Sequence, residues 1–294
     1  MPYVEIDPHS VAVLQAISGE VAQQYIESVL LPSLKRAMHL HGDSVSEIRE
    51  GFSNPYRCLL GFYGHYAFSR RGKDREELGS IANVALKNVA DESHFDDLLS
   101  RADGSVLWDA FDAECRERHH KNPEQLNRGL IQGMVELAQE IYRIDRVGSI
   151  TEWIAKGVRD TRFIEPQFLR IVDIRGVGPK NTSTFLRDVV FLYDLEEGLD
   201  HANRLYVQPI DRWIRMLATD IVTEIDAASA ADWIIAGKIA KYARHAGVSG
   251  VRFNMGATYF GTRYVREAAY LEESLEELLS PNQDEPEAAL GPPS

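Results

Sequence analysis

Residues 168–195 read FLRIVDIRGVGPKNTSTFLRDVVFLYDL, and a polar connector leads from them to VQPID at residues 207–211. Apolar residues recur near helical spacing on both sides of a Gly-Val-Gly turn. Gly176 and Gly178 permit backbone conformations and close approaches that a side chain would block. Pro179 suits the first turn of a helix. The stretch therefore predicts two helices joined by a tight turn, a helix-hairpin-helix over residues 166–193.

A helix that starts directly after such a turn presents unpaired backbone N–H groups and the positive end of its dipole. Both features favour a bound phosphate. We therefore expect the backbone at Gly176, Val177 and Gly178 to contact a DNA strand. We also expect the side chains of Arg175 and Arg187 to contact the backbone of that strand, because guanidinium groups pair well with phosphate.

The motif IRGVGPK at residues 174–180, with Asp211 further on, resembles the helix-hairpin-helix DNA glycosylases, a superfamily that includes endonuclease III and the 8-oxoguanine glycosylases. Lys180 falls on the lysine of the bifunctional members and Asp211 on their catalytic aspartate. The close match covers this segment only. The resemblance implies an all-α fold in which two helical subdomains flank a cleft. It also implies that double-stranded DNA with a damaged or modified base is the partner.

The segment departs from the family pattern at three points. Arg175 replaces the usual hairpin proline, and Trp213 stands where a histidine is common. The connector between Lys180 and Asp211 is longer than in endonuclease III and is more similar to that of the archaeal 8-oxoguanine glycosylase branch. An oxidised purine such as 8-oxoguanine is therefore the expected base.

Lysine and aspartate suit the two steps of such a reaction. Breaking the bond between base and deoxyribose develops positive charge on the sugar, which a nearby carboxylate stabilises. An amine attacks the sugar carbon and forms a covalent intermediate that becomes a Schiff base, from which the 3′ phosphate is eliminated. We therefore expect Lys180 to be the nucleophile and Asp211 to be the electrostatic stabiliser and proton-transfer partner.

The net charge of −13 is an objection to DNA binding, but the acids are unevenly distributed. Eight of them lie in residues 267–294, a segment that has no Lys or Arg. Between residues 143 and 187 basic residues outnumber acids: Arg143, Arg146, Lys156, Arg159, Arg162, Arg170, Arg175, Lys180 and Arg187. A local basic surface matters more for contact with the DNA backbone than the total charge.

Composition excludes several other classes of protein. No apolar run approaches the roughly 20 residues that span a bilayer, and no secretory signal is evident, so we expect a cytoplasmic protein that acts on DNA as a monomer. Cys58 and Cys115 are too few for the four-cysteine iron–sulfur site of some endonuclease III relatives. No metal and no required cofactor are expected, although the resemblance implies a monovalent cation at the hairpin.

The 294 residues suffice for one large unit. We expect residues 1–279 to form one helical catalytic unit of two packed subdomains, and residues 280–294 to form an acidic, Pro-rich, disordered tail. Residues 1–45 predict one short and one longer helix, with Pro32 at a turn or kink. The aromatic residues between Gly51 and Phe68 are best interpreted as packing residues of the core.

Two other functions remain open from the sequence. In a monofunctional glycosylase for alkylated or other modified bases, including foreign DNA, Lys180 only contacts a phosphate. In a non-catalytic DNA-binding protein, Asp211 is only a helix N-cap, which its position after Pro209 favours. Borohydride trapping separates the first alternative from the bifunctional enzyme, because only an imine-forming enzyme becomes crosslinked to DNA.

Overall fold

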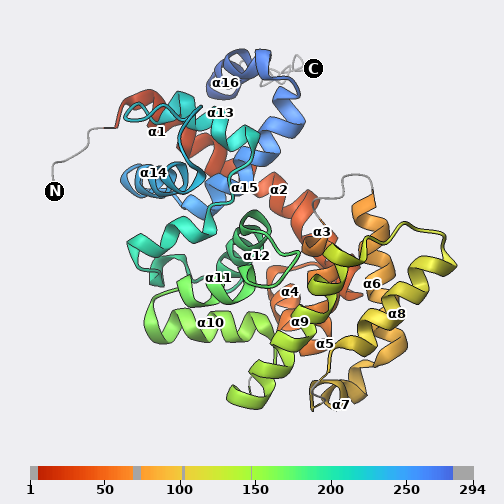
Figure 1. Ribbon diagram of the computed structural model, residues 1–294. Helices are drawn as coiled ribbons and strands as arrows, with labels where there is room; N and C mark the ends of the chain where they lie inside the picture. The colour runs from red at the N-terminus through yellow and green to blue at the C-terminus, as the bar shows by residue number, and fades with distance from the viewer. Residues whose placement is uncertain (1–5, 69–73, 101–102, 147, 281–294) are drawn as a thin grey trace, which may run out of the picture.

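The computed structural model describes residues 6–68, 74–100, 103–146 and 148–280. Every regular element within these ranges is a helix, and none is a strand (Figure 1). The predicted all-α class is therefore confirmed. None of the helices described is both long and apolar enough to cross a membrane. Of the predicted tail, residues 281–294 lie outside the described ranges.

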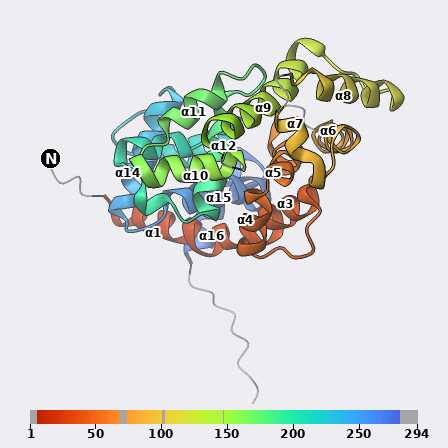
Figure 2. The same ribbon diagram turned by 90° about the horizontal axis from the view of Figure 1, so that it is seen from below.

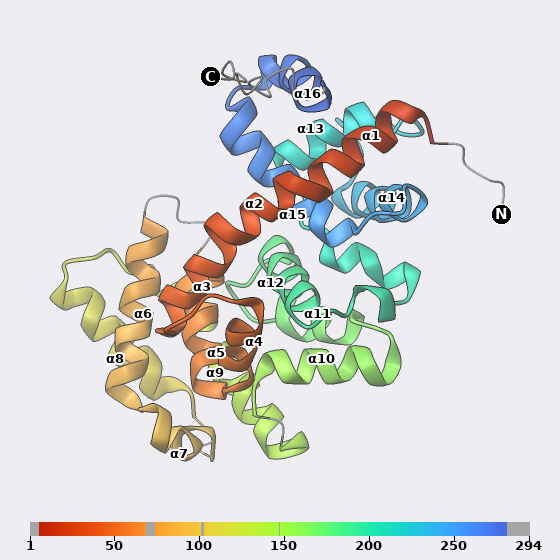
Figure 3. The same ribbon diagram turned by 180° about the vertical axis from the view of Figure 1, so that it is seen from behind.

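The N-terminal segment is a nearly continuous helical rod rather than a short helix followed by a longer one. It comprises α1 (Pro8–Ala16), η1 (Ile17–Val21), α2 (Ala22–Tyr25), η2 (Ile26–Leu30) and α3 (Leu31–Met38) (Figure 3). Gly19 has non-helical angles and kinks the rod. Pro32 does not turn the chain, because it lies in the first turn of α3, directly after the wide π-helical turn η2. A proline has no N–H to donate within a continuous helix, and the wider turn η2 before it lets the rod continue past this residue.

The middle of the chain forms most of the helices. They are α4 (Val45–Ser53), α5 (Pro55–Gly61), η3 (Phe62–Ala67), α6 (Arg75–Val89), η5 (Glu92–His94), α7 (Phe95–Ser100), α8 (Ser105–Glu117), α9 (Glu124–Asp145), α10 (Ile150–Thr161), α11 (Glu165–Val172) and α12 (Pro179–Leu192). Local capping explains several starts: Ser44 forms a capping box with Glu47, and the side chains of Asn54 and Ser149 accept backbone N–H groups. Helices α9 to α12 lie together (Figure 2).

The predicted helix pair of residues 166–193 corresponds to α11 and α12, which contact one another across the turn at residues 173–178. After α12 the chain passes through short helical turns and then forms the C-terminal helices. These elements are η6 (Glu196–Gly198), η7 (His201–Val207), α13 (Arg212–Ile221), α14 (Asp232–His245), α15 (Gly250–Phe260), η8 (Gly261–Val265), η9 (Ala268–Tyr270) and α16 (Leu271–Leu279).

The buried apolar side chains form two clusters. The larger cluster draws on helices from η2 to α12, and includes the aromatic residues of α5 and η3 that were expected to be core residues. The smaller cluster joins α1 and η1 to α13, α14, α15 and α16, so the two ends of the chain pack together. Helix α15 belongs to both, since Val251 and Met255 lie in the larger cluster while Phe253, Ala257 and Phe260 lie in the smaller one.

Candidate active site

The Gly-Val-Gly turn packs directly on α9. Gly176 has a φ of +96°, a conformation that favours glycine. A Cβ atom at Gly176 would lie only 2.5 Å from the carbonyl oxygen of Leu126 at the start of α9. On the same helix, a Cβ at Gly133 would lie 2.5 Å from Cγ2 of Ile174. Glycines on both sides of the contact therefore let the two backbones approach and fix where α12 begins.

Within the turn, the residues expected to bind a DNA backbone fall into different environments. Arg175 is exposed, as a backbone contact requires. Val177 has a buried side chain, and its N–H donates to the carbonyl of Ile174 at 2.9 Å, so that amide is already used within the turn. Gly178 is the N-cap of α12 and makes no side-chain capping hydrogen bond. The first-turn amides of α12 are therefore the best placed donors for an anion.

The structure brings Lys180 and Asp211 to the same cavity, which has a volume of about 530 Å³. Lys180 lies in the first turn of α12 and is exposed, and Asp211 directly precedes α13 and is half-buried. Thr184 and Arg187, which follow Lys180 on one face of α12, also line the cavity. Binding pockets for small organic molecules span roughly 300–1,000 Å³, so a single nucleobase fits this volume.

Both oxygens of the Asp211 carboxylate are held by hydrogen bonds. Oδ1 accepts the backbone N–H groups of Trp213 and Ile214, each at 2.9 Å, and so caps α13. Oδ2 accepts the hydroxyl of Thr258 from α15 at 2.8 Å. The structure therefore confirms the predicted N-cap, and it also fixes the orientation of a carboxylate that borders the cavity. Capping does not exclude catalysis, because the charge remains available to a group in the cavity.

The cavity is mainly basic and aromatic. Among the described residues that line it, the charged ones are Arg75, Lys180, Arg187, Arg263 and the acid Asp211, and Arg187 is paired with Asp188. The other lining residues lie in the N-terminal rod, η3, α12, the loop before α13, α15 and η8: Tyr25, Val29, His65, Tyr66, Asn181, Thr184, Pro209, Thr258, Tyr259 and Thr262. This local excess of cations offsets the negative total charge and suits a phosphate-bearing ligand.

Two tyrosines from distant parts of the chain meet at the cavity. The rings of Tyr25 and Tyr259 are 6.1 Å apart between centroids and pack edge to face. The guanidinium of Arg263 lies 6.0 Å from the centroid of Tyr259. Such rings offer flat surfaces on which a base can stack.

Arg187, predicted to contact a DNA backbone, is buried at the cavity and not exposed on the surface as Arg175 is. Arg187 is only 3% exposed. Its guanidinium donates to Asp188 Oδ1 at 2.8 Å, to Asn254 Oδ1 at 3.0 Å and to the hydroxyl of Tyr25 at 3.2 Å. A buried guanidinium needs such partners because desolvation of an unpaired charge is costly.

The buried arginine instead ties together the elements that surround the cavity. Asn254, which accepts from Arg187, donates through Nδ2 to the carbonyl oxygen of Pro209 at 3.1 Å. Pro209 lies two residues before Asp211, so this bridge positions the segment that carries the carboxylate. Sequence reasoning missed the role of Asn254, because one asparagine in an apolar helix gives no sign of its distant partners.

Burial and charge shift several pKa values beside the cavity. Burial raises the pKa of Tyr25 and of Asp188, and the positive charge of Arg187 opposes both shifts. Burial, together with the charges of Arg75 and Arg187, lowers the pKa of His65 to about 3. His65 is therefore neutral at physiological pH, and its ring has one hydrogen-bond donor and one acceptor.

Other reactive groups are less suited to chemistry. Cys58 and Cys115 are unpaired and buried, and burial raises the pKa of each thiol to about 11. Such thiols are poor nucleophiles because little thiolate is present. In the part of the chain that the structure describes, no group of three His, Cys, Asp or Glu side chains is arranged to hold a metal ion.

Comparison of the chain with protein-family models, with curated proteins and with solved structures found no match. The candidate site therefore depends on the chain's own geometry: a lysine and an aligned carboxylate on one cavity, beside a glycine turn and an uncapped helix start.

Proposed function

We propose that this protein is a DNA glycosylase with associated lyase activity at the abasic site. The observation that carries the proposal is the shared cavity: Lys180 and Asp211 belong to different helical segments, yet both line one space of about 530 Å³. Had the two groups faced separate surroundings, the resemblance of the motif would have had no chemical meaning.

The arrangement of the apolar clusters supports a two-subdomain organisation with the cavity between them. Tyr66, Lys180 and Arg187 belong to segments of the larger cluster, whereas Asp211 and Thr258 adjoin the smaller one. Such a position suits an enzyme that receives a base from outside, because ligand sites often lie where two packed units meet.

The approach of DNA is supported by the turn and by α12. A strand that passes the turn meets the exposed Arg175 and the uncapped first-turn amides of α12, while the extruded nucleotide enters the cavity beside Lys180. Extrusion costs a few kcal/mol of stacking and pairing, and a damaged base pays less of it. Stacking of the base on Tyr25 or Tyr259 offsets part of that cost.

The chemistry then follows from the two groups. As the glycosidic bond breaks, the carboxylate of Asp211 stabilises the positive charge that develops on the sugar. The nitrogen lone pair of Lys180 forms a bond to the C1′ carbon as the base leaves with the electron pair of the glycosidic bond, and the proton lost by the amine is taken up by the departing base. Opening of the sugar ring gives an imine. Loss of a C2′ proton then expels the 3′ phosphate and nicks the strand.

The preferred substrate in this proposal is an oxidised purine such as 8-oxoguanine. The long connector between Lys180 and Asp211 supports it through the family resemblance. The cavity volume and the neutral ring of His65 are also compatible with a purine that presents both hydrogen-bond donors and acceptors.

A monofunctional glycosylase is the second candidate, and the exposure of Lys180 favours it. An exposed lysine beside uncapped helix amides is well placed to bind a phosphate without entering the reaction. In that case Asp211 still assists base release and no covalent adduct forms. The two candidates agree on base release and differ on strand cleavage.

The proposal is tested with a panel of duplexes, each with one modified base, incubated with excess enzyme under single-turnover conditions. We expect base release from at least one duplex. Asp211→Asn should slow that release by about 10²–10³-fold, the loss typical of removing a principal electrostatic stabiliser. Glu196→Gln is the matched control. The Glu196 carboxylate also accepts backbone N–H groups at the start of a helix, here α15, but it is not among the residues that line the cavity. Equal release by the wild type and Asp211→Asn contradicts the assignment.

A further inference from the structure

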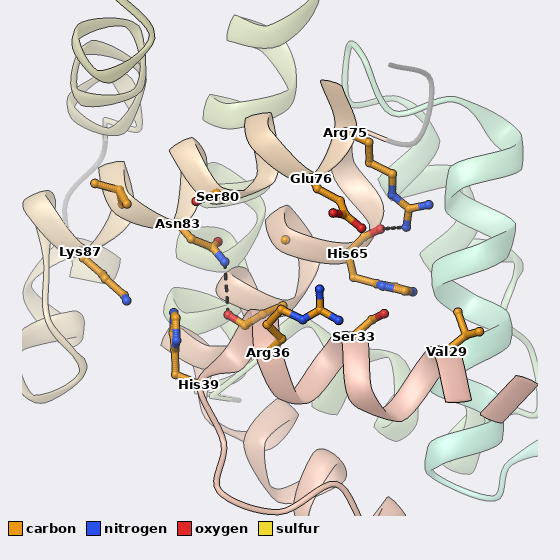
Figure 4. A pocket seen from close by; sticks show the side chains of 13 residues that line it. Val29, Ser33, Arg36, His39, His65, Arg75, Glu76, Ser80, Asn83 and Lys87 are labelled. Carbon is orange, nitrogen blue, oxygen red and sulfur yellow. Dashed lines mark hydrogen bonds between the residues drawn. The ribbon is translucent and has the colours of Figure 1, made fainter. Parts of the chain in front are cut away.

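A second cavity of about 470 Å³ lies beside the first, between α3, η3 and α6 (Figure 4). It shares Val29, His65 and Arg75 with the first cavity, so the two are neighbours. The remaining lining residues are Ser33, Arg36, Ala37, His39, Gly64, Glu76, Ser80, Asn83, Val84 and Lys87. The proposed glycosylase chemistry uses neither this space nor the side chains found only in it.

The second cavity has an excess of positive charge. Arg36, Arg75 and Lys87 line it, and Glu76 is the one acid among its described lining residues. Arg36 and Lys87 are exposed, and neither forms an ion pair with any residue that the structure describes. Exposed cations that line a concave surface and form no ion pair attract an anion, because they are not neutralised within the protein.

One buried polar side chain that lines this space lacks a full set of hydrogen bonds. Asn83 is 7% exposed, and its Nδ2 donates to the carbonyl oxygen of Ala37 at 3.2 Å. Its Oδ1 has no partner among the described residues. His65 is 8% exposed and also lines this space, and Figure 4 shows its ring between Arg75 and Val29, the two other residues shared with the first cavity. A buried acceptor without a partner is rare and indicates a ligand or water that donates to it.

The pKa values of the two histidines show that the cations act on this space. Burial and the charge of Lys87 lower the pKa of His39, and burial and the charge of Arg75 lower that of His65. Two cations from different ends of α6 therefore raise the local potential, one at each histidine.

We infer that this second cavity binds a nucleotide, with its phosphate on Arg36 and Lys87 and a donor group of its sugar or base on Asn83. The three kinds of lining group match the parts of such a ligand: cations for phosphate, an unpartnered acceptor for an N–H or O–H, and the apolar Val29 and Val84 for a base. The nucleotide is either a unit of a DNA strand or a free nucleotide, and both present the same phosphate chemistry.

The test compares two double variants that remove the same charge. Arg36→Ala/Lys87→Ala removes the exposed cations of the cavity, and Lys156→Ala/Arg244→Ala removes two exposed cations outside it. Calorimetry with 2′-deoxyguanosine 5′-monophosphate measures the affinity for a free nucleotide. Fluorescence anisotropy with a labelled duplex at several salt concentrations measures the affinity for a DNA strand.

For a free nucleotide, we expect the cavity variant to bind 2′-deoxyguanosine 5′-monophosphate at least tenfold more weakly than both the wild type and the control. For a strand, we expect the duplex affinity to fall by at least tenfold and the salt slope to become shallower by about one to two. Equal losses in the two variants, or no loss with either ligand, would overturn the inference.

A second pair of variants distinguishes loss of binding from loss of folding. Ser80→Glu places a negative charge at the exposed rim of the cavity and should weaken the same binding at least fivefold, whereas Ser105→Glu on α8 should leave it unchanged. Unchanged binding in Ser80→Glu contradicts the inference. The outcome does not depend on base release. If the cavity variants lose nucleotide binding while the wild type releases no base from any duplex of the panel, the second cavity is supported and the glycosylase proposal is refuted.

Discussion

Asp211 combines an observed structural role with the chemical role that we propose for it. Its Oδ1 caps α13 and its Oδ2 accepts from Thr258, so the orientation of the carboxylate is fixed before any substrate arrives. Preorganisation of this kind is what makes electrostatic stabilisation effective, since no reorganisation is needed during the reaction.

Replacement of Asp211 separates the two roles. Asparagine caps helices about as well as aspartate, whereas alanine loses the cap at a cost of about 1 kcal/mol. We expect Asp211→Asn to leave the free energy of unfolding in urea nearly unchanged, and Asp211→Ala to lower it by about 1 kcal/mol. Both variants should lose base release. A stable Asp211→Asn that retains full activity would leave the residue with capping alone.

His65 gives the molecule a sensitivity to acid that originates beside the cavity. Its pKa is lowered to about 3 in the folded protein, while the unfolded chain has the ordinary value of about 6.5. As the pH falls below 6.5, His65 becomes protonated in the unfolded state but stays neutral in the folded state. Stability is therefore lost between pH 6.5 and about 3, at about 1.4 kcal/mol per pH unit.

His65→Gln removes this contribution. Between pH 7 and pH 5 the wild type should lose about 2 kcal/mol more of its unfolding free energy than the variant does. The exposed His41→Gln is the control and should behave like the wild type. Urea titrations at the two pH values measure the difference, and equal losses in wild type and His65→Gln would mean that the buried ring is not the source.

For single residues, the sequence pointed to Lys180 and Asp211 but did not reveal that Arg187 is buried. Lys180 and Asp211 were predicted from a local motif, and both line the cavity. Arg187 follows the same hairpin, yet it is buried by Tyr25 and Asn254, which lie far away in the sequence. Local spacing cannot reveal partners that only the folded chain brings together.

Among the elements, the Gly-Val-Gly turn depends on its contact with α9. The turn needs both the positive φ of Gly176 and the absence of a side chain, because a Cβ would lie 2.5 Å from the Leu126 carbonyl oxygen. The sequence indicated that glycine was required at Gly176, but it did not indicate which helix lies against it. Gly133, which supplies the other half of the contact, looked like an ordinary helix residue.

We expect Gly176→Ala to lower the free energy of unfolding by at least about 1–2 kcal/mol, the cost of a left-handed conformation for alanine before the clash is added. Gly237→Ala is the control, and it should change the free energy of unfolding in the opposite direction. Gly237 lies within α14 with nothing within 4 Å of an added Cβ, so alanine should stabilise the helix by up to about 1 kcal/mol. If chemical denaturation shows the two variants equally stable, the turn is not held as described.

Helix positions were more predictable than helix continuity. Caps at Ser44, Asn54 and Ser149 mark true starts, because the capping side chain and the amides it binds are local. Pro32 was expected to turn the chain, but a proline in the first turn of a helix does not break it. Whether the preceding helix continues into that turn depends on packing along the whole rod.

For the molecule as a whole, α15 links the two apolar clusters. Val251 and Met255 pack in the larger cluster, and Phe253 and Phe260 pack in the smaller one. If either cluster unfolds, one face of α15 becomes exposed, and the other cluster loses the support of that helix. This coupling should make the described helices unfold together, although chains of this length often unfold through intermediates.

Two single-tryptophan variants test this coupling. One retains Trp108 in the larger cluster and the other retains Trp213 in the smaller cluster, with the remaining tryptophans changed to phenylalanine. We expect the fluorescence and far-UV circular dichroism of each variant to give coincident urea transitions. A Trp213 transition at clearly lower urea than the dichroism would show that the smaller cluster unfolds alone.

The structure shows how charge is distributed in this acidic protein. The protein carries a net charge of −13, yet most of the charged residues described as lining the two neighbouring cavities are cations. An acidic protein with a basic site binds DNA locally and repels it elsewhere, so affinity should be modest and strongly dependent on salt.

The central claim, that Lys180 attacks the sugar, is tested most directly by borohydride trapping on a duplex with an 8-oxoguanine or an abasic site. Wild-type protein and Lys156→Gln, an exposed lysine outside the cavity, should form a covalent complex with DNA that survives denaturing electrophoresis. Lys180→Gln should bind the same duplex and form none. Trapping of Lys180→Gln at the wild-type level would place the nucleophile elsewhere, and no trapping of the wild type on a duplex from which it releases a base would make the enzyme monofunctional.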